Sequence, residues 1–285
     1  MKSSCLLASS ALLGLTLAAC GSGSMPDPGS RTGDAQIVDL DNLRITVHGR
    51  AQVFPEATPL LTGQGRPPLV LAGMPLAIEE PLRVDVSDAE ATFATGTLEE
   101  DAGFSIPEVP VKDIHLSLAA SLEHEGLART STIVFDTAFT GSRPRTDVIG
   151  AQVWAVPLEF VDALDRAVGA EALQVHTNGQ AHTLQEAGFV LGRVVDAKGQ
   201  PVAGARVRLD QRELVGRIYY PLEDLSQADR EGTSANGLFV YVHSGGDAET
   251  FRVSVEGLDS YVWRNAGAMA GRGLVLTLYP GAYAP

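Results

Sequence analysis

Apolar and polar residues alternate along much of the chain between residues 43 and 139. Five segments place apolar side chains at nearly every second position: LRITVHGRAQVF (43–54), PLRVDVSD (81–88), AGFSIPEVP (102–110), DIHLSLAASL (113–122) and TSTIVFDTAF (130–139). A period of two is that of a strand with one buried face, and the Gly, Pro and Asp residues between the segments mark turns. The pattern predicts an antiparallel β-sandwich over residues 39–150.

The segment VPLEFVDALDRAVG, residues 156–169, has a different period. Its apolar residues recur at helical spacing: Leu158, Val161, Leu164 and Val168. Pro157 suits the first turn of a helix and Gly169 suits its end. We predict one short amphipathic helix within a linker of residues 151–186. Its apolar stripe is expected to pack onto a sandwich, rather than to bind a partner helix.

Residues 187–285 contain the most regular pattern of the chain, FVLGRVVDAKGQPVAGARVRL at 189–209. It indicates a strand, a turn and a second strand, with Gly199 able to take a positive φ in the turn. Pro201 follows where the ladder needs no N–H group. The expected fold class is all-β, with two antiparallel β-sandwich modules, immunoglobulin-like or transthyretin-like, joined by a short helical segment.

A series of positions in this second module carries a family resemblance. They are Gly192, Asp196, Gly199, Pro201, Gly204, Val207, Thr233, Asn236, Gly237 and Phe239. Their order resembles the carboxypeptidase regulatory-like domain. The resemblance implies a transthyretin-like, carbohydrate-binding-like β-sandwich that serves as an accessory module beside enzymes and on bacterial surface proteins. The first module echoes the pattern more weakly, so it is either a second copy or a different immunoglobulin-like sandwich.

The N-terminal segment, residues 1–19, has the form of a signal peptide, with Lys2 followed by an apolar run too short to span a bilayer. The junction LAACG at 17–21 resembles the lipobox of bacterial lipoproteins. That resemblance implies cleavage before Cys20, acylation of Cys20 (palmitate among the chains) and, because Gly21 follows, transport to the outer membrane. The alternative is a plain signal peptide with a free Cys20. Residues 20–38 are rich in Gly, Ser and Pro and predict a flexible tether.

Charge and cysteine content narrow the functional classes. The chain has 21 Lys and Arg against 35 Asp and Glu, a net charge of −14, and no dense basic patch. Nucleic acid is therefore not an expected partner. The two cysteines, Cys5 and Cys20, both precede the folded part, which excludes a disulfide, a zinc–thiolate site and a cysteine nucleophile there. The six histidines form no metal-binding motif, so no metal or cofactor is predicted.

One enzyme resemblance remains as the alternative. The segment at 192–207 followed by GRIYYP (216–221) also resembles intradiol ring-cleavage dioxygenases, which bind iron through two tyrosines and two histidines. By this resemblance Tyr219 or Tyr220 would be one ligand, but only His243 lies downstream, so the histidine half of the iron shell is missing. No Gly-x-Ser-x-Gly elbow supports a hydrolase. We therefore expect no enzyme, with a divergent dioxygenase-like protein or a hydrolase as the alternative.

The segment 211–232 is expected to be a long loop, and long loops on rigid sandwiches often carry binding sites. Tyr219 and Tyr220 give it a surface suited to sugar or peptide recognition. Alternatively, the two rings close the open end of the sandwich core. Taken together, these features predict a non-enzymatic envelope protein with a binding or structural role. Its partners would be the membrane, through the lipid anchor, and an envelope protein or polysaccharide.

Overall fold

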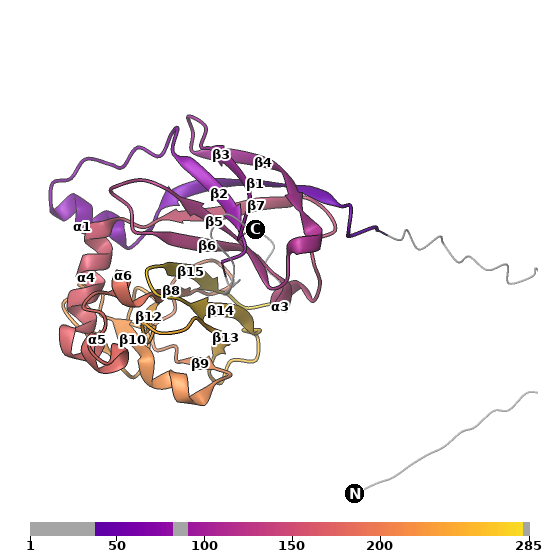
Figure 1. Cartoon of the computed structure of the whole chain (residues 1–285). Helices are drawn as coiled ribbons and strands as arrows, with labels where there is room; N and C mark the ends of the chain where they lie inside the picture. Colours follow the sequence, from indigo (N-terminus) through magenta and orange to yellow (C-terminus); the bar gives the residue numbers. More distant parts are fainter. Residues whose placement is uncertain (1–37, 82–90, 282–285) are drawn as a thin grey trace, which may run out of the picture. The chain divides into compact units, whose positions relative to one another are not determined.

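A computed structural model describes residues 38–81 and 91–281, and Figure 1 shows their helices and strands. Cys20, the tether up to residue 37 and most of the strand predicted at 81–88 lie outside these residues. The described part is mostly β, which confirms the expected fold class. Among the residues described, no helix is long and apolar enough to cross a membrane.

The first half of the described chain is a sandwich of two sheets. One is three-stranded, in the order β4 (Gly103–Pro110), β1 (Arg44–Val53), β7 (Val148–Ala155). The other face comes from β2 (Pro75–Glu79), β3 (Thr92–Thr97), β5 (Ser117–Leu122) and β6 (Thr130–Asp136). Short helical turns connect them: α1 (Ala57–Gly63), η1 (Val111–Asp113) and α3 (Thr137–Thr140). Val47, Ile78 and Leu118 lie fully buried between the two sheets.

The second half extends the same large sheet. Its strands are β8 (Phe189–Val194), β10 (Ile218–Pro221), β11 (Ala228–Asp229), β12 (Leu238–Val242) and β15 (Gly273–Leu278). The complete order is β11-β10-β12-β8-β15-β6-β5-β2-β3, nine strands in all. A separate three-stranded sheet consists of β14 (Arg264–Ala268), β13 (Glu249–Val255) and β9 (Val207–Leu209). The helical elements are α4 (Leu158–Val168), α5 (Ala170–Thr177), α6 (Leu184–Ala187) and η2 (Arg212–Arg217).

Strand β8 is buried along its whole length because both of its faces are covered. Phe189 and Leu191 pack with the core side of α4 and α6, whereas Val190 and Val194 pack with the β14-β13-β9 sheet. Gly192 is required by packing, since a Cβ there would lie 2.0 Å from Cζ of Phe239. The first strand of the patterned stretch at 189–209 therefore lies in the core of the fold.

The predicted helix is confirmed as α4, from Leu158 to Val168, with Pro157 at its N-cap and Gly169 at its C-cap with a φ of 91°. Its buried side includes Phe160, Val161 and Leu164, each 0% exposed. The apolar stripe therefore packs on the core, as expected from the sequence. The predicted turn is also present, because Gly199 has a φ of 76° and the Asp196 carboxylate accepts hydrogen bonds from two backbone N–H groups of the turn.

Strand pairing differs from the purely antiparallel expectation in three places. β1 pairs in parallel with β7, and β15 pairs in parallel with both β6 and β8. Alternation along one strand says nothing about the direction of its neighbour, which is why the sequence did not reveal these pairs. The β15–β6 pair also joins the two halves in one sheet (Figure 1). The division into modules at residues 151–186 stays a prediction.

Candidate functional site

The nine-stranded sheet forks beside β15. This strand pairs with β6 only from Gly273 to Val275, opposite residues 130–132, but it continues beside β8 as far as Leu278. Strand β6 meanwhile continues beside β5 as far as Asp136. Since β6 and β15 are parallel, their carboxyl ends diverge from the same point. A wedge-shaped opening between the two strands follows from this pairing.

A cavity of about 550 Å³ lies at this opening, and we call it the forked-sheet cleft. Its walls come from the ends of β6 and β15, from β7 and β8, from the start of β14 and from the segment 139–147. Its apolar lining includes Ile133, Phe135, Phe139, Val148, Ile149, Trp154, Leu276 and Tyr279. A volume of this size is typical of sites for small organic ligands.

Arg264, the first residue of β14, places a buried cation in the lining of the cleft. Its guanidinium carbon lies 3.5 Å from the ring centroid of Phe139 and 4.2 Å from that of Tyr279. The two rings meet edge to face, with their centroids 5.5 Å apart. Arg264 is only 5% exposed, so burial lowers the pKa of its guanidinium, which Tyr279 and Asp136 partly counteract. The side chain remains charged at neutral pH.

The hydrogen-bonding capacity of Arg264 is only partly used. Within the described part of the chain, its Nε and Nη2 atoms are shielded from solvent and have no hydrogen-bond partner. Asp136 also lines the cleft, but its oxygens are occupied by other donors. Its Oδ1 accepts from the backbone N of Ala138 and from Nδ2 of Asn265, both at 2.8 Å, and its Oδ2 accepts from the backbone N of Asn265 at 3.0 Å. Burial raises the pKa of the Asp136 carboxyl.

A second buried arginine in the lining, Arg193 on β8, has its charge compensated. Its Nη2 lies 2.9 Å from Oε1 of Glu56, and its guanidinium lies near the rings of Phe54 and Trp154. Burial raises the pKa of Glu56, and the charge of Arg193 opposes that rise. The Arg193–Glu56 pair is therefore close to neutral as a unit.

The mouth of the cleft adds two further cations, Arg143 and Arg145, which form no ion pair in the regions that the structure describes. The charged lining residues are thus four arginines and two aspartates, Asp136 and Asp147. The cleft is locally cationic in a chain whose net charge is −14. Anions are therefore favoured in the cleft over cations of the same shape.

The structure does not place Tyr219 and Tyr220 on the expected loop, because residues 212–221 form η2 and β10. The two side chains point to opposite faces of β10 and belong to different core clusters. The Tyr219 hydroxyl lies 2.7 Å from Nε2 of His176, and the Tyr220 hydroxyl accepts a hydrogen bond from the backbone N of Val207. The pair forms no common contact surface, and a role in binding stays a prediction.

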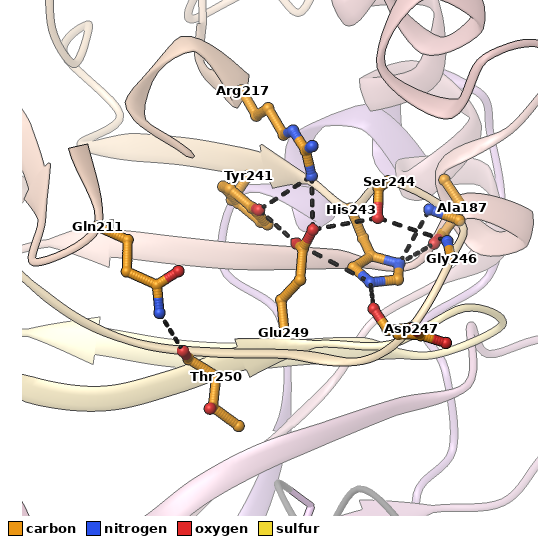
Figure 2. Close-up of polar contacts among 11 residues, drawn as sticks. Ala187, Gln211, Arg217, Tyr241, His243, Ser244, Gly246, Asp247, Glu249 and Thr250 are labelled. Atoms are coloured by element: carbon orange, nitrogen blue, oxygen red, sulfur yellow. Dashed lines mark hydrogen bonds and ion pairs between the residues drawn. The ribbon is translucent and has the colours of Figure 1, made fainter. Parts of the chain in front are cut away.

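Figure 2 shows a second cluster of polar residues, at the turn between β12 and β13. Oε1 of Glu249 accepts hydrogen bonds from Nη1 of Arg217 at 2.6 Å and from Oγ of Ser244 at 3.1 Å. Its Oε2 accepts from the Tyr241 hydroxyl. Burial raises the pKa of Tyr241, and the neighbouring Glu249 carboxylate raises it further. These contacts hold Glu249 in one orientation.

His243 belongs to the same cluster and is fully buried. Its Nδ1 lies 2.8 Å from the carbonyl oxygen of Ala187, and its Nε2 lies 2.9 Å from that of Asp247 (Figure 2). The ring therefore links the turn to the end of α6. The Ser244 hydroxyl donates to Glu249 and not to the imidazole of His243. Ser244, His243 and Glu249 are therefore not arranged as a serine nucleophile activated by a histidine base.

The residues of the iron-binding resemblance do not meet at one point. Tyr219, Tyr220 and His243 each contact a different partner, as described above. Within residues 38–81 and 91–281, no three His, Cys, Asp or Glu side chains are grouped as metal ligands would be. The expectation that the protein needs no metal or cofactor stays a prediction.

Comparisons with known proteins give no family assignment: no family model and no curated protein matches the chain. Solved structures that align over 85% of the chain include three bacterial proteins. A mutant of the shaft pilin SpaA from Lactobacillus rhamnosus GG is 13% identical and covered over 99% of its length, with a TM-score of 0.20. A streptococcal ancillary pilin is 11% identical and covered over 64% of its length, with a TM-score of 0.22. The Bacillus anthracis TIE protein is 8% identical and covered over 34% of its length, with a TM-score of 0.19. Similarity this low carries no functional argument.

Proposed function

We propose that this chain is a non-enzymatic, lipid-anchored protein of a bacterial envelope, and that its folded part binds an envelope component in the forked-sheet cleft. The anchor is proposed from the LAACG motif at 17–21, with Cys20 as the acylated residue. Outer-membrane localisation is proposed from Gly21. The membrane and an envelope protein or polysaccharide are the partners proposed, and the net charge of −14 argues against nucleic acid.

The observation that carries the binding role is the cleft itself. It combines about 550 Å³ of volume with an aliphatic and aromatic lining and a buried guanidinium, a mixture typical of ligand sites. Its charged groups suit holding a ligand better than transforming one, because arginine keeps its proton at neutral pH. Asp136, the buried carboxylate in the lining, is already engaged by Asn265 and the backbone of α3.

The anchor is tested by metabolic labelling with an alkyne analogue of palmitate. We expect label on the wild-type chain and none on Cys20→Ser, because the thioether at Cys20 is the attachment required before the amine is acylated. Equal labelling of both chains would contradict the anchor.

The binding role is tested on the full chain carrying Cys20→Ser, so that detergent does not compete for the apolar cleft. We expect the uncharged dye N-phenyl-1-naphthylamine to bind saturably, with increased fluorescence. Ser142→Trp fills the mouth of the cleft and should weaken binding at least about tenfold. Thr58→Trp, on the exposed side of α1, is the matched control and should bind as the wild type does.

Thermal unfolding of each variant shows whether it is folded, and Ile149→Trp provides a second obstruction at an exposed position of the lining. If the dye does not bind saturably, or if folded mouth-filling variants bind it as tightly as Thr58→Trp does, the cleft is not a binding site.

A further inference from the structure

We infer that the ligand of the forked-sheet cleft carries a carboxylate on an apolar body, and that Arg264 binds this carboxylate. The inference rests on the proposed function, since it names the chemical class that the same cleft takes. Three features of the lining support it: the charge, the arrangement of the unpaired donors and the apolar walls.

The two buried arginines of the lining differ in how their charges are compensated. Arg193 has Glu56 at 2.9 Å, whereas Arg264 has no ion pair with any described carboxylate. Electrostatic attraction is stronger in a partly desolvated cleft than in water, so an anion near Arg264 is stabilised substantially. Arg143 and Arg145 at the mouth attract the same charge from solution. A neutral ligand gains no such charge attraction, and a cationic ligand is repelled by these groups.

The nitrogens of Arg264 that lack a partner among the described residues share one edge of its guanidinium. Nε and Nη2 carry parallel N–H bonds on one edge of the guanidinium, and both lack a partner within the described structure. This edge is the fork that binds the two oxygens of a carboxylate at once. The ring of Phe139 lies over the guanidinium and is carried by α3, an element of four residues. Because both nitrogens are shielded from solvent, side chains around this edge must move when a carboxylate binds there.

The apolar walls define the rest of the ligand. Ile133 on β6 and Leu276 on β15 line the cleft on the two sides of the fork. Ile149 also belongs to the lining, and its side chain is 65% exposed. An exposed isoleucine beside a cationic cavity becomes covered when an apolar body enters. An aromatic or aliphatic group of about ten carbons, with one acidic end, fits this lining and this volume.

The inference is tested with two ligands of the same shape. 1-Naphthaleneacetate and 1-naphthaleneacetamide share an apolar body and differ in the charged carboxylate. Isothermal titration calorimetry on the Cys20→Ser chain at neutral pH should show the carboxylate binding at least about tenfold more tightly. Arg264→Met should bring the ratio of the two dissociation constants close to one.

Arg252→Met is the matched control, because Arg252 also lies near an aromatic ring, that of Trp263, but outside the cleft. It removes the same charge from the chain and should keep the preference for the carboxylate. Arg264→Lys keeps the charge without the fork, so an intermediate ratio is expected. If Arg264→Met does not fold, as judged from its thermal unfolding, the ratio in Arg264→Lys decides.

The outcomes separate the inference from the proposed function. Equal binding of acid and amide to the wild type, or an unchanged preference in folded Arg264 variants, overturns the inference and leaves the cleft a binding site. Tighter binding of 1-naphthyl phosphate than of the acetate overturns the assignment to carboxylates. If the dye does not bind saturably, the proposed binding role of the cleft is itself overturned.

Discussion

A charged side chain that is buried without an ion pair usually reduces stability, and Arg264 is such a residue. The rings of Phe139 and Tyr279 offset part of the desolvation cost by cation–π contact, but Nε and Nη2 still lack acceptors in the described structure. Residues kept for binding often cost stability in this way. The free energy of unfolding therefore distinguishes a ligand-binding arginine from a structural one.

We predict that Arg264→Met, without ligand, unfolds within about 1 kcal/mol of the wild type, since losing the cation–π contacts is offset by removing a buried charge. Arg193→Met should lower the free energy of unfolding by about 2–4 kcal/mol, because Glu56 then stays buried without its partner. Urea denaturation measures both. A larger loss for Arg264→Met than for Arg193→Met would make Arg264 a structural residue.

Tyr220 gives a second prediction at this scale. Its hydroxyl is the acceptor for the buried backbone N–H of Val207, so Tyr220→Phe should lower the free energy of unfolding by about 1–2 kcal/mol. Tyr219→Phe should cost less, because His176, its partner, is partly exposed to water. Thermal unfolding of the two variants tests this difference. Equal stability of Tyr220→Phe and the wild type would show that the hydroxyl is not needed.

Among the helices, α4 and α6 are linked by one carboxylate. Oδ1 of Asp165 in α4 accepts a hydrogen bond from the backbone N of Leu184 at the start of α6. Burial raises the pKa of Asp165 to about 6, with the charges of Asp162 and Glu186 adding to the rise. A carboxyl with a raised pKa takes up a proton on folding. Its contribution to stability is therefore greatest at low pH and falls as the pH rises from about 4 to about 6.

Asp165→Asn removes this pH dependence, because the amide oxygen can still accept from Leu184 and carries no charge. We predict that the variant is more stable than the wild type by about 1–2 kcal/mol above pH 7, a figure reduced for the partial exposure of the group. The difference should vanish near pH 4. Denaturation series at several pH values measure it, and the same difference at every pH would contradict the assignment to Asp165.

Elements with a strong local signal were predictable from the sequence. The strands β1, β4, β5, β6 and β8, the helix α4 and the turn at 196–199 all coincide with the periodicity or the turn residues that predicted them. The strand β10 was missed because four consecutive buried residues, IYYP, have no alternation to detect. Its burial on both faces depends on α4 and on the β14-β13-β9 sheet, which lie elsewhere in the sequence.

At the scale of the whole molecule, fragments test whether the two halves fold separately. A fragment of residues 187–285 loses α4–α6 and the β6 partner of β15. It would expose Phe189, Leu191 and Val275, which are 0% exposed in the chain. If residues 187–285 are a separate module, as the sequence predicts, this fragment shows one cooperative thermal transition, and a fragment of residues 156–285, which keeps the helices, unfolds at a higher temperature. A transition of the shorter fragment that is not cooperative would show that the two halves share one core.

The forked-sheet cleft could not be predicted from the sequence. Its central residues, Phe139, Arg264 and Tyr279, come from segments far apart in the chain, and none belongs to a recognisable motif. The cleft exists because β15 crosses back to pair with β6 and then diverges from it, which is a property of topology. The available signal was the presence of Arg193 and Arg264 among apolar neighbours in an acidic chain.

The most direct test of the binding site is a crystal structure of the Cys20→Ser chain soaked with 4-bromo-1-naphthaleneacetate, in which anomalous scattering locates the bromine. We predict a bromine peak between the diverging ends of β6 and β15, with the carboxylate oxygens within about 3.2 Å of Nε and Nη2 of Arg264. A bromine peak only outside the forked-sheet cleft, or a carboxylate inside it that points away from Arg264, would contradict the proposed site.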